Sequence, residues 1–192
     1  MKNLNKLYVT ARVTQPIESN MSKSGRTCYV HLCLDNLKSK HPMYIQAKAL
    51  VSITPEIKTV KKGDVLRLCL AVKTDDFIAK STNRLRRKPT YMIREMNVTG
   101  KHVENIGHLA GYITDMRLGR TSGTVVICTN SKLSTQTILQ VNRKKALASL
   151  RNFQVADWIN VNYSLHNSVN ANNQYTHNVH LDSVNYGHNL NK

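Results

Sequence analysis

Strict alternation of apolar and polar residues recurs along the chain and predicts a protein built mainly from β-strands. In residues 7–13 every odd position is apolar, whereas Tyr8, Thr10 and Arg12 lie between them. A period of two is typical of a strand with one buried and one outward face. Five such runs occupy the first half of the chain, at residues 7–13, 27–34, 43–49, 65–73 and 91–98.

The second half repeats the order of these signals. Its runs lie at residues 109–113, 123–129, 136–141, 157–163 and 175–184. Between the third and fourth runs, residues 142–152 have Ala146, Leu147 and Leu150 at helical spacing, which predicts a helix with one apolar side. The matching stretch of the first half contains Pro55, so we expect a short or broken helix there.

Five strands with a helix between the third and fourth, twice over, predict an all-β chain of two tandem five-stranded OB-fold barrels. The expected domains are residues 1–104 and 105–186. Residues 187–192 are expected to form a loose C-terminal tail, with order decreasing from about residue 185.

Charge narrows the choice of partners. The 192 residues include 28 Lys or Arg and 11 Asp or Glu, a formal net charge of +17. Such a surplus attracts polyanions through counterion release, which favours nucleic acid first and an acidic membrane surface second. The chain has no basic amphipathic helix, no lipidation motif and no apolar run of the roughly 18 residues that span a bilayer. Because the N-terminus also lacks a secretory signal, we expect a cytoplasmic or nucleoid-associated protein.

Catalytic and metal-binding patterns are missing. The four cysteines have no CxxC spacing and are expected to be buried, reduced thiols. No phosphate-binding glycine loop or GxSxG motif is present, and the few carboxylates do not cluster as a two-metal site requires. We therefore expect no enzyme activity, no metal and no cofactor.

Outward positions of the first-half strands combine aromatic and basic residues. Rings on which bases stack and cations that contact phosphates are the chemistry of single-strand binding. Ordinary strand propensity is the alternative explanation, since tyrosine is common in strands. The candidates are Tyr8, Arg12, Tyr29, Tyr44, Lys48 and Arg67, with His31 and Gln46 beside them.

The densest basic run lies between the fourth and fifth runs of the first half. Its candidates are Arg84, Arg86, Arg87 and Lys88, followed by Pro89. We interpret it as a mobile loop that closes over a nucleic-acid strand; a solvated charge run is the alternative.

The second half offers fewer cations but contains the single tryptophan. Alternation places Trp158 on a polar face with Asn160, and Tyr112 also points outward from its strand. Trp158 is a candidate for stacking or for the junction between barrels. The alternative is a tryptophan that covers one end of its barrel.

Three stretches resemble a known family. Residues 106–115 (IGHLAGYITD) have an apolar–Gly pattern that ends in Asp, residues 155–161 (VADWINV) look like a fourth strand, and residues 60–68 (VKKGDVLRL) contain Lys-Gly-Asp before apolar residues. All three are similar to the single-stranded DNA-binding protein family. The C-terminus HNLNK departs from the acidic, Phe-terminated tip of the bacterial members. Recruitment of partners through that tip is therefore not expected.

The resemblance implies a non-enzymatic protein that binds single-stranded DNA in replication, recombination or transfer. RNA binding and a protein–protein scaffold role in a replication-type complex remain as alternatives. A homo-oligomer and replication-type proteins are the protein partners to consider.

Overall fold

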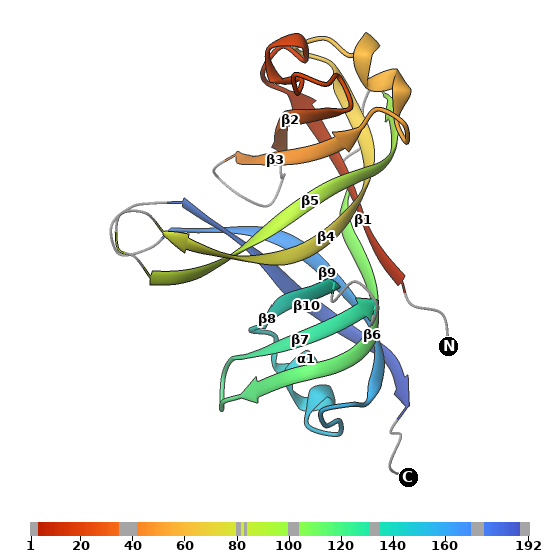
Figure 1. Cartoon of the computed structure of the whole chain (residues 1–192). Helices are drawn as coiled ribbons and strands as arrows, with labels where there is room; N and C mark the ends of the chain where they lie inside the picture. Colours follow the sequence, from red (N-terminus) through yellow and green to blue (C-terminus); the bar gives the residue numbers. More distant parts are fainter. Residues whose placement is uncertain are drawn as a thin grey trace. The chain divides into compact units, whose positions relative to one another are not determined.

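Ten β-strands make up most of the described part of the chain. A computed structural model describes residues 4–34, 42–79, 82, 84–99, 104–130, 135–169 and 175–188. The strands are β1 (Leu4–Val13), β2 (Thr27–Leu34), β3 (Met43–Leu50), β4 (Val65–Ala79), β5 (Arg84–Val98), β6 (Asn105–Leu118), β7 (Gly123–Asn130), β8 (Thr135–Val141), β9 (Trp158–Val169) and β10 (Tyr175–His188) (Figure 1). None of the helices among these residues is long and apolar enough to span a membrane.

Strand pairing closes on itself among β1–β5. The antiparallel pairs are β1 with β2, β1 with β4 and β2 with β3, and β3 pairs with β5 in parallel. The neighbouring β4 and β5 complete the ring. Pro55–Thr59 forms a 3₁₀ helix between β3 and β4, which agrees with the expected short helix.

Strands β6–β10 follow the same order. The antiparallel pairs are β6 with β7, β6 with β9, β7 with β8 and β9 with β10, and β8 pairs with β10 in parallel. The helix α1 (Lys144–Leu150) lies between β8 and β9, contacts β10 and buries Ala146, Leu147 and Leu150, as predicted. The all-β prediction with OB-type strand order is confirmed.

Internal contacts divide the chain into two units. The N-terminal unit consists of Lys6–Val72 and Thr90–Asn105. The C-terminal unit consists of Met1–Asn5, Lys73–Pro89 and Ile106–Lys192. The segment Lys73–Pro89, which we call the arm, therefore belongs to the C-terminal unit by its contacts, although it contains the ends of β4 and β5. The domain boundaries given above stay predictions.

The predicted inward faces form the core of each unit. In β1 the residues Leu7, Val9, Ala11 and Val13 are all buried. In the C-terminal unit, the residues Ile159, Val161, Tyr163 and Leu165 of β9 are likewise buried. Close-packed apolar side chains inside a ring of strands supply the main stabilisation, at about 25 cal/mol for each Å² removed from water.

Three strand boundaries that bear on the candidate binding residues differ from the sequence prediction. β4 continues to Ala79 and β5 begins at Arg84, so the basic run lies on a strand and not in a loop. β10 continues to His188, so residues 185–188 are strand and not tail. Gly187 allows this pairing because a Cβ there would overlap the ring of Phe153. Residues 189–192 lie outside the described ones.

The cysteines are reduced, and three of the four are buried. Cys28 points inward as predicted, and burial raises the pKa of its thiol. Cys33 and Cys69 have outward parity yet are also buried, and they lie in register with Arg12 and Tyr8 of β1. Burial likewise raises the pKa of Cys69. Cys128 is half-buried, which differs from the expectation of four buried thiols.

Two histidines pack together on the β9–β10 ribbon. The rings of His166 and His180 lie 4.6 Å apart between centroids. Burial, and then the charge of His166, lower the pKa of His180 from its ordinary value of 6.5. The charge of Asp182 raises this pKa, and the charge of Arg143 lowers it further. The folded chain therefore favours neutral His180.

This preference predicts a pH-dependent stability. Because the folded pKa lies below the unfolded one, the contribution of neutral His180 is present above about pH 6.5 and is lost as the pH falls through the folded value. We expect the urea midpoint to fall between pH 7.5 and pH 5 by more in the wild type than in a His180→Asn variant. An equal fall in both proteins would contradict this.

Candidate nucleic-acid interface

The outer surface of β2 and β3 brings together several predicted binding residues of the N-terminal unit. Cross-strand register places Tyr29 opposite Lys48 and Cys33 opposite Tyr44. Both tyrosines are well exposed, at 44% for Tyr29 and 57% for Tyr44. The surface formed by Tyr29, His31, Cys33, Tyr44, Gln46 and Lys48 is called the β2–β3 face below.

Neighbouring contacts order this face and extend it. The side-chain amide of Gln46 hydrogen-bonds the ring of His31 at 3.0 Å, between the two tyrosines. Arg12 of β1 lies in register with Cys33 and is exposed, so an Arg12–Cys33–Tyr44 row crosses three strands. Cys33 follows Tyr29 by four positions, which is about 13 Å along β2. The face thus offers two separated rings with a cation near each.

Tyr8 and Arg67 lie on another part of the ring, where β1 pairs with β4. Arg67 makes two hydrogen bonds with Glu104, at 3.0 Å from Nε and 2.9 Å from Nη2. The hydrogen-bonded Glu104 carboxylate raises the pKa of Arg67 and compensates its charge. Because Glu104 already pairs with it, Arg67 is a weaker phosphate ligand than the sequence suggested. The sequence did not show this pair, because the two residues are 37 positions apart.

The arm has two different faces. An ion pair of 3.0 Å joins Asp76 of β4 to Arg87 of β5, so these residues share one face, the inner face. Lys88 lies over the ring of Phe77, 5.3 Å from its centroid, on the other, outer face. Since side chains alternate along a strand, Arg84 and Arg86 share the outer face with Lys88. Arg87 is thus separated from the other three predicted cations.

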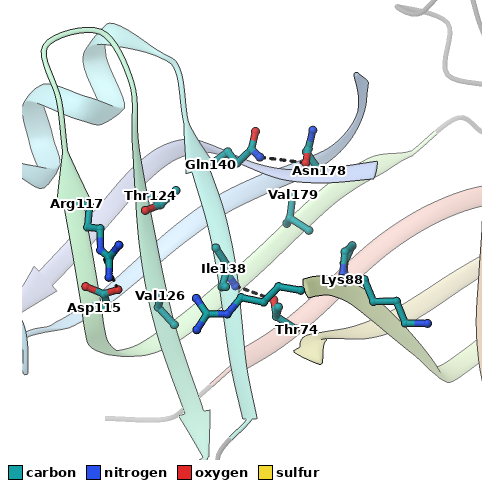
Figure 2. Close-up of a pocket in the computed structure, with 12 residues that line it drawn as sticks. Thr74, Lys88, Asp115, Arg117, Thr124, Val126, Ile138, Gln140, Asn178 and Val179 are labelled. Atoms are coloured by element: carbon teal, nitrogen blue, oxygen red, sulfur yellow. Dashed lines mark hydrogen bonds and ion pairs between the residues drawn. The ribbon is translucent and has the colours of Figure 1, made fainter. Parts of the chain in front are cut away.

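The inner face of the arm is seated on β7 and β8 within the C-terminal unit. Thr74 Oγ1 accepts a hydrogen bond of 3.0 Å from the backbone N–H of Ile138. Figure 2 shows Thr74 of the arm beside Ile138 of β8, whereas the side chain of Lys88 points away from these strands. A hollow of about 290 Å³ remains between the arm and these strands. A second of about 360 Å³ shares Thr74, Val126 and Ile138 and adds Asp75 and Asp76.

Charges around the two hollows are balanced. Arg87 and Arg117 are paired with Asp76 and Asp115, and Asp75 is paired with Lys73. Lys88 also lines the first hollow, but its ammonium lies over Phe77 on the outer face. Arg117 lies 3.5 Å from Asp115, as Arg87 lies 3.0 Å from Asp76. Phosphate would meet nearby carboxylates here, so the seat of the arm is unlike a polyanion channel.

The outward residues of β7 and β8 differ from those of β2 and β3. They are Thr124, Val126, Cys128, Gln136, Ile138 and Gln140. This set contains no aromatic ring and no cation, and the arm covers part of it. The two rings of strands are therefore not equivalent as binding surfaces.

Trp158 lies in a covered position. It is only 2% exposed, and its ring centroid lies 5.6 Å from that of Tyr186. This low exposure favours the alternative of a covering tryptophan over an exposed stacking residue, and Tyr186 of the extended β10 lies against it. Tyr112 is in register with Trp158 and is 40% exposed, as its outward parity predicted.

Sequence reasoning missed Tyr186, because the predicted last strand ended at residue 184. Tyr186 is exposed and accepts a hydrogen bond of 3.1 Å from Asn160 Nδ2. Beside it, Asn185 Nδ2 donates to both Asn160 Oδ1 and Asn162 Oδ1 at 3.0 Å. The asparagines thus order one another and the tyrosine. Among the described residues no three His, Cys, Asp or Glu side chains are grouped to hold a metal ion.

Comparison with solved structures identifies a shared fold. A deletion and point-substitution variant of the single-stranded DNA binding protein from Thermus aquaticus matches with a TM-score of 0.68 and 13% identity, over 95% of this chain and 94% of that one. The wild-type protein matches with a TM-score of 0.66 and 13% identity, over 96% and 93%. The likeness is one of fold. No protein-family model and no curated protein sequence matches the chain.

The hydrogen bond from Ile138 to Thr74 can be tested directly. A Thr74→Val variant keeps the shape of the side chain but leaves the Ile138 N–H without its acceptor, at a cost of about 1–2 kcal/mol. We expect faster hydrogen exchange of the Ile138 amide and a lower urea midpoint. The control is Thr74→Ser, which keeps the hydroxyl and should exchange as the wild type does; slow exchange in both variants would contradict the contact.

Proposed function

We propose that the chain is a non-enzymatic single-stranded nucleic-acid-binding protein, with single-stranded DNA as its ligand. In this proposal the two rings of strands are tandem OB barrels, and the protein coats or protects DNA in replication, recombination or transfer. The β2–β3 face carries the proposal: it presents Tyr29, Tyr44 and Lys48 outward on the two strands that OB folds use for binding. The fold shared with the Thermus aquaticus single-stranded DNA binding protein supports the same function.

Binding at this face needs no base-specific contact. Bases stack on the exposed rings of Tyr29 and Tyr44, and the phosphates between them lie near Lys48 and Arg12. The His31–Gln46 hydrogen bond fixes the polar groups between the two rings before the strand arrives. Every base has a π-face, so we expect weak sequence preference and strong salt dependence.

The outer face of the arm supplies further phosphate contacts. Arg84, Arg86 and Lys88 are exposed there, whereas Arg87 is paired with Asp76 on the inner face. In the C-terminal unit, exposed Tyr112 and Tyr186 are the rings available for stacking, with Trp158 supporting Tyr186 from below. Tyr8 and Arg67 are assigned smaller roles, since Arg67 is occupied by Glu104.

Removing the two rings tests the stacking contribution. Stacking on an aromatic side chain is worth about 1–3 kcal/mol per base. We therefore expect Tyr29→Leu and Tyr44→Leu each to weaken binding to a labelled oligo-dT by about tenfold or more, measured by anisotropy. Val155→Leu, at an exposed loop position, is the control. Unchanged affinity in both tyrosine variants would refute the role of the β2–β3 face.

The two faces of the arm predict different effects of losing charge. Replacing Arg84, Arg86 and Lys88 together by Gln removes three phosphate ligands and should lower the slope of log affinity against log salt by about 2. Replacing Arg87, Lys61 and Lys62 by Gln removes the same charge without touching the outer face. If both triple variants change the slope equally, the cations act only through net charge and the assignment of the outer face is wrong.

A further inference from the structure

The far end of the arm exposes a pair of large aliphatic side chains. Ile78 is 63% exposed and Leu85 is 64% exposed. Ile78 follows Asp76 by two residues in β4, and Leu85 precedes Arg87 by two in β5. Because Asp76 and Arg87 are ion-paired across the two strands, Ile78 and Leu85 share the inner face of the arm, beyond the part seated on β8.

The apolar pair lies in a segment rich in basic residues. Arg84 and Arg86 flank Leu85 directly in the sequence, and Arg87 follows on the same face. Over its whole length the segment Lys73–Pro89 contains six basic and two acidic residues. Exposed aliphatic residues at the end of a basic two-stranded ribbon need an explanation, because solvation alone favours polar side chains at such positions.

We propose that Ile78 and Leu85 form a wedge that packs against the terminal base pair where a duplex joins the bound single strand. The inference rests on the proposed single-strand binding and extends it to a preference for such junctions. A terminal base pair exposes an apolar stacking surface, and proteins that unstack or kink DNA use aliphatic side chains in this way. Arg84, Arg86 and Lys88 on the outer face then contact phosphates of the strand that leaves the duplex.

The charges favour nucleic acid over a second copy of the chain as the occupant. Two copies that met through this tip would bring together two arms that each contain six basic and two acidic residues. Like charges brought together in an interface oppose association. A nucleic-acid junction instead supplies both an apolar surface and negative charge.

The test compares a forked DNA with its own single-stranded tail. Both carry a tail of about 16 nucleotides, and the fork has 2-aminopurine in its terminal base pair. We expect the wild type to bind the fork about tenfold more tightly than the tail and to raise the 2-aminopurine fluorescence. The Ile78→Ser, Leu85→Ser double variant should bind the fork no better than the tail, with its tail affinity within about twofold of the wild type.

Two controls separate the wedge from general effects. The Ile53→Ser, Val155→Ser variant removes two exposed apolar side chains elsewhere and should keep the fork preference. The Ile78→Leu, Leu85→Met variant keeps an apolar tip and should keep it too. Tail binding without fork preference in the wild type would overturn the wedge alone, whereas binding to neither DNA would overturn the proposed function and the wedge together. A fork preference unchanged in the double Ser variant, with sedimentation showing loss of a dimer, would make the tip a contact between copies.

Discussion

The closure of five strands into a ring is the constraint on which the rest of the structure depends. In the N-terminal unit, β1 pairs with both β2 and β4, so each of the five strands has a neighbouring strand on both sides. Closure around an interior as narrow as that of five strands commits one side of every strand to the core. Residues that contact a ligand can then lie only at outward positions of the strands or in segments that extend beyond the ring. In the proposed function, Tyr29, Tyr44 and Lys48 are outward residues of the ring, and the arm extends beyond it.

Closure also explains which features could be predicted from the sequence. Inside a ring, burial enforces alternation, so the strands and their inward faces were readable, as was α1 with Ala146, Leu147 and Leu150. In the arm no such core exists, and residues 74–79 and 84–90 do not alternate; their strand structure was therefore missed. Parity gives the side on which a residue lies but not what covers it. For that reason alternation placed Trp158 on the polar side but could not decide between an exposed and a covered position; Tyr186 packs against it from a strand whose length was underestimated.

The same order of strands supports two different surfaces. On β2 and β3 the outward residues include two exposed tyrosines and a lysine, whereas on β7 and β8 they are small, aliphatic or amide side chains beneath the arm. The strands that contact the arm need side chains without a net charge, whereas a nucleic acid needs aromatic rings and cations. One set of outward positions cannot provide both. The arm itself has the same two kinds of surface. Arg87 is paired with Asp76 on the inner face, whereas Arg84, Arg86 and Lys88 lie on the outer face.

The contacts that hold the arm have a consequence for how the molecule responds to its ionic surroundings. The Thr74–Ile138 hydrogen bond is between uncharged groups, and the cations at the seat have carboxylates close by. Dissolved ions screen long-range attraction to a polyanion far more than they affect a short hydrogen bond between neutral groups. If the chain binds a nucleic-acid strand as proposed, rising ionic strength releases that strand while the arm stays in place. The affinity for the strand then changes with salt, whereas the fold of the C-terminal unit does not.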